Sequence, residues 1–146
     1  MSAEQNKAVL RRYFEELWNK GNLAVIDECI APGMSLNEEK NVSLDKWRQA
    51  LTAWLTALPD FEYHVDLLIA EGDIVAAKTH FTGTHLGVYD FGGWGPWPPT
   101  GNSIEIKEFI FFRLVGGKIV EMWDSWDDKK FALQLGGQPP VPAATA

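Results

Sequence analysis

Apolar side chains in the first 60 residues recur at the three- and four-residue spacing of amphipathic helices. Capping residues, glycine and proline mark where such helices begin and end. The first helix opens with a capping box, in which the side chains of Ser2 and Gln5 each bond the other residue's backbone. The pattern predicts three helices, bounded by Ser2 and Gly21, by Asn22 and Cys29, and by Ser43 and Pro59.

After Pro59 the apolar positions alternate, which is typical of strands that bury one face. The predicted strands cover 34–36, 61–70 and 74–85, with a hairpin inside 104–128. A last helix is expected to begin at a cap formed by Ser125 and Asp128 and to end at Gly136.

This order of elements predicts an α+β fold. We expect a cone-shaped, strongly curved antiparallel sheet packed on the three N-terminal helices, with an apolar pocket for a small molecule inside the cone. The prediction is one domain over residues 1–136, followed by a flexible Pro-rich tail over 137–146.

Composition narrows the classes of function. Seven Trp and eight Phe among 146 residues are unusual, because Trp is a costly residue to use as core filler. A net charge of −7 argues against binding to a nucleic-acid backbone. One cysteine, Cys29, excludes an internal disulfide, and no His, Cys or carboxylate spacing fits a metal site. We see neither a signal peptide nor a membrane span and expect a cytoplasmic protein.

The first strand of the hairpin carries one carboxylate on an otherwise apolar face. Alternation places Glu108 on the same face as five large apolar side chains, Ile104, Ile106, Ile110, Phe112 and Leu114. Burying a charge among such side chains is unfavourable unless the group is paired or protonated. Glu108 is therefore a candidate functional residue.

The turn of the hairpin determines which residue faces Glu108. A two-residue Gly-Gly loop places Glu108 opposite Ser125. A three-residue Val-Gly-Gly loop, with Gly117 in a left-handed conformation, places Glu108 opposite Asp124. We favour the second register, because it uses glycine where its conformational freedom is needed.

In that register two carboxylates share an apolar surface. Their mutual repulsion would cause one of them to retain a proton near neutral pH. Such a pair can act as a general acid and base. The alternative is that Asp124 only caps the helix that follows it.

A long aromatic loop precedes the hairpin. Residues 87–101 contain Tyr89, Phe91, Trp94 and Trp97, whereas disordered loops are poor in aromatic side chains. We interpret this loop as a lid that places Trp94 and Trp97 against an apolar ligand. The alternative is a loop packed on its own aromatics or on a second subunit.

Short motifs follow one another along the chain in a fixed order: Pro59-Asp60, Gly72-Asp73, Gly83-Thr84-His85, Thr100-Gly101, Arg113, Gly117-Lys118-Ile119-Val120-Glu121 and Trp123-Asp124. Their order and spacing resemble the SnoaL-like polyketide cyclases, a family of the NTF2-like superfamily. The resemblance covers nearly the whole chain before the Pro-rich tail. It implies an NTF2-like, or cystatin-like, α+β barrel.

The resemblance also implies chemistry and assembly. Cyclases of this family use one aspartate as general acid and base for an intramolecular aldol closure, without cofactor or metal, and that role would fall on Asp124. A homodimer or larger homo-oligomer is implied, formed through the outer face of the sheet. This chain departs from the family pattern at four positions: Met122 for a His, Lys78 for an Arg, and Glu108 and Ile110 at two polar pocket positions.

We therefore expect an enzyme that needs no cofactor, with Asp124 as general acid and base assisted by Glu108. Its substrate would be an apolar, polycyclic or isoprenoid small molecule, and its reaction a cyclisation or isomerisation. Epoxide-hydrolase-like hydrolysis in the same cone and a non-catalytic protein that binds hydrophobic ligands are the alternatives. The side chains expected to contact substrate are Phe14, Trp18, Trp54, His85, Trp94, Trp97, Ile110 and Met122.

Overall fold

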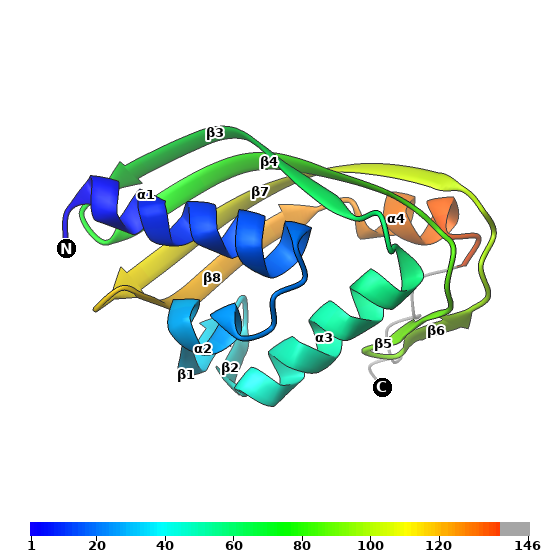
Figure 1. Ribbon diagram of the computed structural model, residues 1–146, viewed down its shortest axis with the longest axis horizontal. Helices are drawn as coiled ribbons and strands as arrows, with labels where there is room; N and C mark the ends of the chain where they lie inside the picture. The colour runs from blue at the N-terminus through cyan, green and yellow to red at the C-terminus, as the bar shows by residue number, and fades with distance from the viewer. Residues whose placement is uncertain (138–146) are drawn as a thin grey trace, which may run out of the picture.

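The computed structural model describes residues 1–137, which form a curved sheet with helices packed against one of its faces (Figure 1). The sheet has the order β2 (Glu39–Val42), β1 (Ile30–Leu36), β8 (Lys118–Trp126), β7 (Ser103–Val115), β4 (Ile74–Thr84) and β3 (Glu62–Glu71). The predicted α+β class and curved sheet are confirmed. The tail predicted to be flexible lies, apart from Gly137, outside the described residues.

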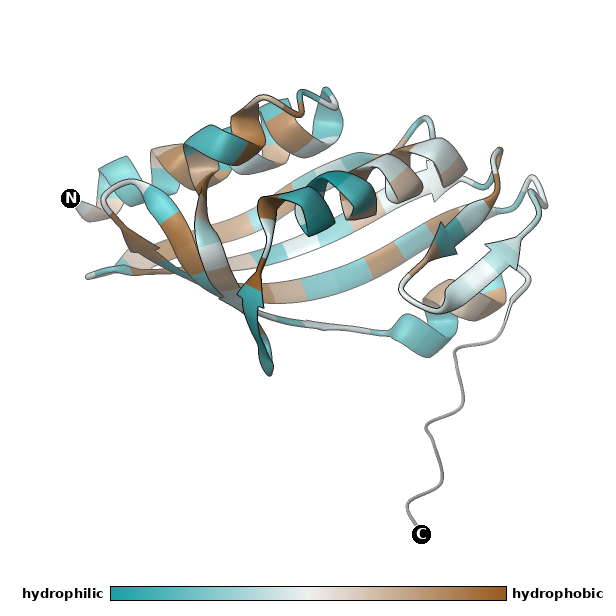
Figure 2. Cartoon of the chain, turned by 90° about the horizontal axis from the view of Figure 1, so that it is seen from below, coloured by the Kyte–Doolittle hydropathy of each residue, from teal (hydrophilic) through white to brown (hydrophobic). Residues whose placement is uncertain are grey.

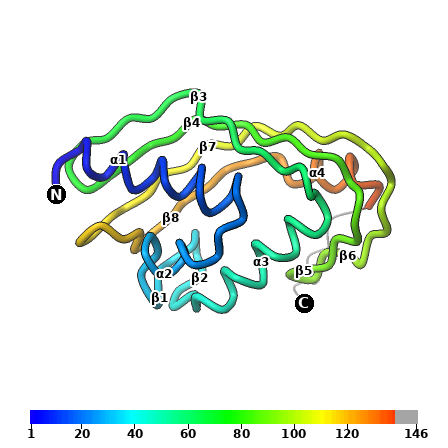
Figure 3. Tube along the Cα trace, in the orientation of Figure 1, coloured from blue at the N-terminus to red at the C-terminus, as the bar shows by residue number. Residues whose placement is uncertain are grey.

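The N-terminal helices follow the predicted order and meet the concave side of the sheet, as the tube in Figure 3 also shows. They are α1 (Ala3–Arg12), the π-helical segment η1 (Tyr13–Asn19), α2 (Val25–Cys29) and α3 (Leu44–Ala57). The capping box predicted at Ser2 and the start of a helix at Ser43 are confirmed, whereas the N-cap of α2 is Ala24 and not the predicted Asn22. No helix within the described residues is both long and apolar enough to span a membrane.

The π-helical turn of η1 was not predicted, because its side chains follow ordinary helical spacing. Its wider winding appears in the backbone bond from Lys20 N to Glu15 O, which spans five residues. The segment buries Tyr13, Phe14, Leu17 and Trp18 against the sheet. Two of these four, Tyr13 and Trp18, also line the cavity described below.

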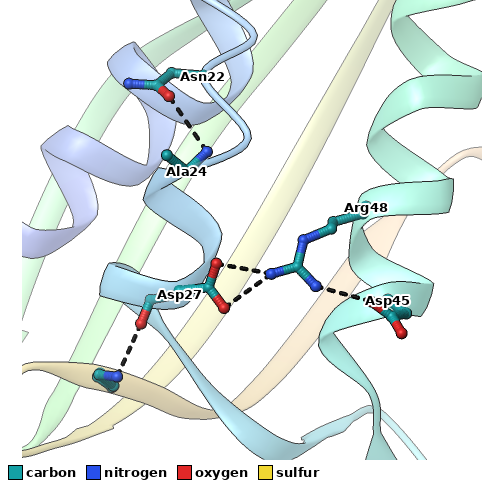
Figure 4. Close-up of polar contacts among 6 residues, drawn as sticks. Asn22, Ala24, Asp27, Asp45 and Arg48 are labelled. Carbon is teal, nitrogen blue, oxygen red and sulfur yellow. Dashed lines mark hydrogen bonds and ion pairs between the residues drawn. The ribbon is translucent and has the colours of Figure 1, made fainter.

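Charged contacts join α2 to α3 at the surface (Figure 4). Arg48 of α3 donates to both carboxylate oxygens of Asp27 on α2, at 2.8 and 2.7 Å, and to Asp45 on its own helix at 2.8 Å. Such a two-pronged contact fixes orientation as well as distance. It helps to hold α3, which carries Trp47 and Trp54, over the concave face of the sheet.

The sheet is mixed, whereas a fully antiparallel one was expected. β1 runs parallel to β8, with Leu36 beside Met122, and β2 adds an antiparallel strand at the edge. β1 starts at Ile30, earlier than the predicted Met34. β2 escaped prediction because its first three residues, Glu39 to Asn41, are polar and exposed, so no apolar alternation marks it.

Hydrophobic and hydrophilic residues alternate along much of the long strands (Figure 2). Along β7, every even-numbered residue from Ile104 to Leu114 is buried on the concave face. Apolar residues on the outer face are exposed, with Phe109 and Phe111 each 53% accessible. The same alternation divides β8, where Met122 and Asp124 face the cavity while Glu121 and Trp123 contact Arg113 on the other side.

The hairpin register differs from both predicted alternatives. The turn is the two-residue Gly-Gly loop, with Val115 paired to Lys118, so the favoured three-residue loop is wrong. A β-bulge then leaves Val120 without a partner, and beyond it Ile110 pairs with Asp124 and Glu108 with Trp126. Since a shift of one residue moves every side chain to the other face, the bulge restores the concave orientation of Asp124 that the short turn alone would remove.

The N-cap of the last helix lies two residues after the predicted N-cap, Ser125. In α4 (Asp128–Gln134) the N-cap is Asp127, whose Oδ1 accepts the backbone N–H of Lys130 at 2.8 Å. The predicted cap at Ser125 is therefore wrong, since Ser125 is still part of β8. Asp124 is likewise part of β8, which removes the alternative that it only caps this helix.

Candidate functional site

A cavity of about 250 Å³ lies between η1, α3 and the concave face of the sheet. Its lining is mostly aromatic and aliphatic, with polar groups contributed by Tyr13, Asn37, Tyr63, Glu108 and Asp124. A concave, apolar pocket with a few convergent polar groups is the usual form of a small-molecule site. The two predicted carboxylates are thus in one cavity, although they are not directly opposite each other in the sheet.

Glu108 is the buried member of the pair, with 5% of its surface exposed. Tyr63 of β3 donates its hydroxyl to Glu108 Oε1 at 2.6 Å, and Thr79 of β4 donates to the backbone carbonyl of Glu108 at 3.0 Å. The pKa of Glu108 is raised to about 8: burial is the largest cause, the Tyr63 hydrogen bond opposes it, and the charge and hydrogen bonding of Asp124 add to the increase. Glu108 is therefore mostly a neutral carboxylic acid at pH 7.

Asp124 has a more polar environment near the end of β1. Asn37 donates its side-chain amide to Asp124 Oδ1 at 2.7 Å and accepts the backbone N–H of Asp124 at 2.9 Å. Asn37 also donates its own backbone N–H to the carbonyl of Met122 at 2.8 Å. These three bonds fix the Asp124 carboxylate as an acceptor at the cavity wall.

A left-handed backbone conformation at Asn37 allows its side chain to form the two hydrogen bonds with Asp124. Its φ is 52°, in the left-handed region. Among residues other than glycine, Asn is one of those that adopt this region most often. The residue forms the turn from β1 to β2, so its amide reaches Asp124 on β8 across the parallel pair. No periodic signal in the sequence marks Asn37, and its role appears only once β1 and β8 are paired.

The eight predicted substrate contacts divide into three groups. Four of the eight side chains line the cavity: Trp18, Trp54, Ile110 and Met122. Phe14 is fully buried behind the lining, edge-on to Tyr13 and Tyr63. His85, Trp94 and Trp97 lie outside the lining.

Residues 87–101 form a small β-hairpin, β5 (Tyr89–Phe91) and β6 (Trp94–Trp97), which packs on α3 and α4. Trp97 stacks on Tyr89 with ring centroids 5.7 Å apart, and Trp94 lies 6.3 Å from Trp126. This arrangement matches the alternative of a loop packed on its own aromatics. Phe91 of β5 still lines the cavity, and Trp94 of β6 packs near Trp126 of β8, which also lines it, so the hairpin supports one wall of the cavity.

His85 is fully buried at the base of that hairpin. Its Nδ1 lies 3.1 Å from Thr100 Oγ1, and its backbone pairs with Asn102 and Gly101. Burial lowers the pKa of His85, which favours the neutral imidazole. In this position His85 anchors the ends of the 87–101 segment.

Sequence reasoning missed five lining residues that bear polar atoms: Tyr13, Asn37, Trp47, Tyr63 and Trp126. The alternation in β3 did place Tyr63 on the same face as Phe61, but gave no reason to connect it with Glu108 two strands away. Within residues 1–137, no group of three or more His, Cys, Asp or Glu side chains is arranged to hold a metal ion.

The fold and the cavity together define an NTF2-like α+β cone that holds a pair of carboxyl groups in unlike surroundings. Residues 8–135 match the family model of the SnoaL-like polyketide cyclases, and the chain belongs to this family. No curated protein sequence matches the chain significantly.

Solved structures support the same assignment. AclR from Streptomyces galilaeus, a proposed hydroxylase, is 30% identical with a TM-score of 0.76, over 97% of this chain and 87% of that one. IdmH from Streptomyces antibioticus, a proposed polyketide cyclase, is 26% identical with a TM-score of 0.72, over 90% and 99% of the two chains. A SnoaL-like protein from Jannaschia sp. CCS1 shares the fold at 22% identity, with a TM-score of 0.79 over 94% and 95%.

Proposed function

We propose that this protein is a cofactor-independent acid–base enzyme that removes a proton from carbon next to a carbonyl group in an apolar, polycyclic substrate. The observation that carries the proposal is the pair of carboxyl groups in one cavity with different surroundings. Glu108 is buried and bonded by a tyrosine, whereas Asp124 is held by an amide near the protein surface. Pairs whose environments separate their protonation states are suited to divide the roles of acid and base.

In the proposed reaction Asp124 accepts the proton from carbon. Neutral Glu108 donates a hydrogen bond to the carbonyl oxygen and stabilises the negative charge that develops there. The enolate then attacks a second carbonyl of the same molecule, and the proton held by Asp124 passes to the new alkoxide. Carbon–carbon closure of this kind needs no redox partner and matches the family to which the chain belongs.

The rest of the cavity supports an apolar substrate. Trp18, Trp54, Ile110 and Met122 are proposed to contact it, and Phe81 and Trp126 complete the aromatic end of the lining. Burial of flat apolar surface against these rings would supply binding free energy at about 25 cal/mol per Å². The carboxyl groups would then act on the oxygen-bearing part of the substrate.

The experiment that tests this proposal separates binding from proton transfer. Aromatic β-ketoesters of increasing ring number are incubated with the protein in deuterated buffer, and exchange at the carbon between the carbonyls is followed by NMR. Binding is measured in parallel by quenching of tryptophan fluorescence. We expect the wild-type protein to catalyse exchange and ring closure of the polycyclic β-ketoesters. The Asp124→Asn variant should bind the same compounds with comparable affinity but catalyse exchange about 10³-fold more slowly.

Two outcomes would redirect the proposal. Binding without any catalysed exchange would favour the protein that sequesters a hydrophobic ligand. Exchange that persists in Asp124→Asn would move the base to another residue. Asparagine keeps the shape and can still contact Asn37, so a loss of folding is not expected from this change.

A homodimer is part of the proposal, formed through the outer face of the sheet. Leu67, Ile69, Phe109 and Phe111 are each more than half exposed there. The strand register brings them together, because Lys78 lies between Leu67 and Phe109, and Ala76 between Ile69 and Phe111. Contiguous apolar surface of this kind commonly marks an interface between proteins.

A further inference from the structure

We infer that Tyr63 is a positioning residue for the acid of this site: it occupies one oxygen of the Glu108 carboxyl and leaves the proton on the other. This inference rests on the proposed role of Glu108 as the hydrogen-bond donor to substrate. It adds a fourth element, β3, to a pair of carboxyl groups otherwise held by β7, β8 and the turn after β1. A tyrosine at this position acts on the reaction through Glu108 and not by contact with the reacting atoms.

The geometry of the contact is specific. Tyr63 Oη lies 2.6 Å from Glu108 Oε1, which is a short distance even for hydrogen bonds between oxygens. Both side chains are buried, at 7% and 5% exposure, so water competes little for either group. Among the described residues, Tyr63 is the side chain that bonds the Glu108 carboxyl within 3.5 Å, and the nearby Asp124 side chain raises the pKa of Glu108 by its charge and as a further hydrogen-bond partner.

The direction of donation follows from the chemistry of the two groups. Burial raises the pKa of Tyr63 well above its usual value, so its hydroxyl keeps its proton and serves as the donor. The oxygen of Glu108 that accepts this bond is the carbonyl oxygen of the neutral acid. Its own proton then resides on Oε2, the oxygen to which Tyr63 does not donate.

Packing holds the Tyr63 ring in this orientation. Phe14, Phe61, Phe81 and Trp18 surround it, with ring centroids between 5.1 and 5.6 Å from that of Tyr63. On the Glu108 side, the bond from Thr79 to the backbone of Glu108 ties β4 to β7 at the same level of the sheet. The surrounding rings therefore orient the Tyr63 hydroxyl toward Glu108. A different rotamer of Glu108 would lose the hydrogen bond from Tyr63.

Tyr63→Phe removes the donor and keeps the ring. A hydrogen bond stabilises an ionised carboxylate more than a neutral acid, so its loss should raise the pKa of Glu108 above its value of about 8. The matched control is Tyr13→Phe, because Tyr13 lines the same cavity, is equally buried and gives its hydroxyl to Met122 Sδ at 3.8 Å. Both variants delete one buried hydroxyl, but only the first touches Glu108.

The test is infrared difference spectroscopy of the Glu108 carboxyl as a function of pH, with Glu108→Gln as the blank that identifies its C=O band. We expect the band to titrate near pH 8 in the wild type and about one pH unit higher in Tyr63→Phe, with the C=O stretch moved to higher frequency. Tyr13→Phe should leave both the midpoint and the frequency unchanged. Fluorotyrosine at position 63, a stronger donor, should move the midpoint downward.

The inference is overturned if Tyr63→Phe and Tyr13→Phe give the same midpoint and frequency, or if fluorotyrosine moves the midpoint upward. The fluorotyrosine protein keeps this decision available even if the Phe variant folds poorly. Failure of the proposed function has a different signature, namely no catalysed exchange at carbon while the titrations still behave as described. The two ideas can therefore fail independently.

Discussion

The two faces of β7 contrast in a way that reverses the usual distribution of side chains. On the concave face a carboxyl group, Glu108, is buried among aliphatic and aromatic residues. On the outer face Phe109 and Phe111, its close neighbours in sequence, are each 53% exposed. Stability alone would favour the opposite arrangement. We attribute the two exceptions to the proposed function: the buried carboxyl to the proposed reaction, and the exposed phenylalanines to the proposed interface.

The buried carboxyl should give the largest effect, and it is measured as stability against pH. The pKa of Glu108 is raised in the folded state to about 8 from an ordinary value of 4.5, so the folded state binds the proton more tightly than the unfolded chain. The stabilisation that results is complete below pH 4.5 and is lost as the pH rises through 8. The loss should reach up to ~5 kcal/mol above pH 9.

Glu108→Gln is the variant that removes this dependence. Glutamine can still accept the Tyr63 hydrogen bond and offers an N–H where the acid has its proton. Urea unfolding at a series of pH values should therefore show wild type and variant nearly equal at pH 5 and the variant more stable at pH 9. Parallel curves across that range would show that Glu108 ionises normally and that the concave face holds no neutral acid.

The exposed phenylalanines should give a smaller effect, and it is measured as association. Phe111→Lys places a charge in the middle of the proposed interface and should weaken self-association at least about 30-fold, or ~2 kcal/mol. Sedimentation at micromolar concentration reports the change. Leu133→Lys is the control, since Leu133 is similarly exposed at 59% but lies on α4.

A wild-type monomer at those concentrations would contradict the interface and would leave the cavity unaffected. Ligand binding by Phe111→Lys should equal that of wild type, because its side chain points away from the concave face. A loss of binding in the monomeric variant would indicate that the second subunit contributes to the site.

The β5–β6 hairpin should give the smallest effect of the three. Trp97 is partly buried against Tyr89, and the backbone of Gly137 approaches it so closely that a Cβ there would lie 2.1 Å from the ring. Trp97→Ala should lower the free energy of unfolding by about 1–2 kcal/mol while changing ligand affinity little. Trp54→Ala, which removes a lining residue, is the comparison.

The reverse result, a loss of ligand affinity in Trp97→Ala with unchanged thermal stability, would restore the interpretation of this segment as a lid. Calorimetry in the absence of ligand separates the two cases. The outcome would also show whether the 87–101 segment contacts the ligand or only stabilises the wall of the cavity.

Local pattern alone determined much of this protein. Helical spacing indicated the N-terminal helices, Ser2 and Ser43 marked where two of them begin, and alternation placed Glu108 on a buried face. All three signals depend on neighbours within a few positions along the chain. The resemblance of short motifs to one family pointed to Asp124 and to the cone. These predictions needed no knowledge of which strands meet.

Tertiary structure decided how the site is assembled. The bulge at Val120 sets the face of Asp124, and it arises from pairing between strands that no single stretch of sequence specifies. Tyr63 and Asn37 reach the two carboxyl groups from β3 and from the turn after β1, 45 and 87 residues away in the chain. Hydrogen bonds across such separations depend on the packed arrangement of the whole sheet. The sequence determined that a carboxyl would be buried, and only the fold determined which residues hold it.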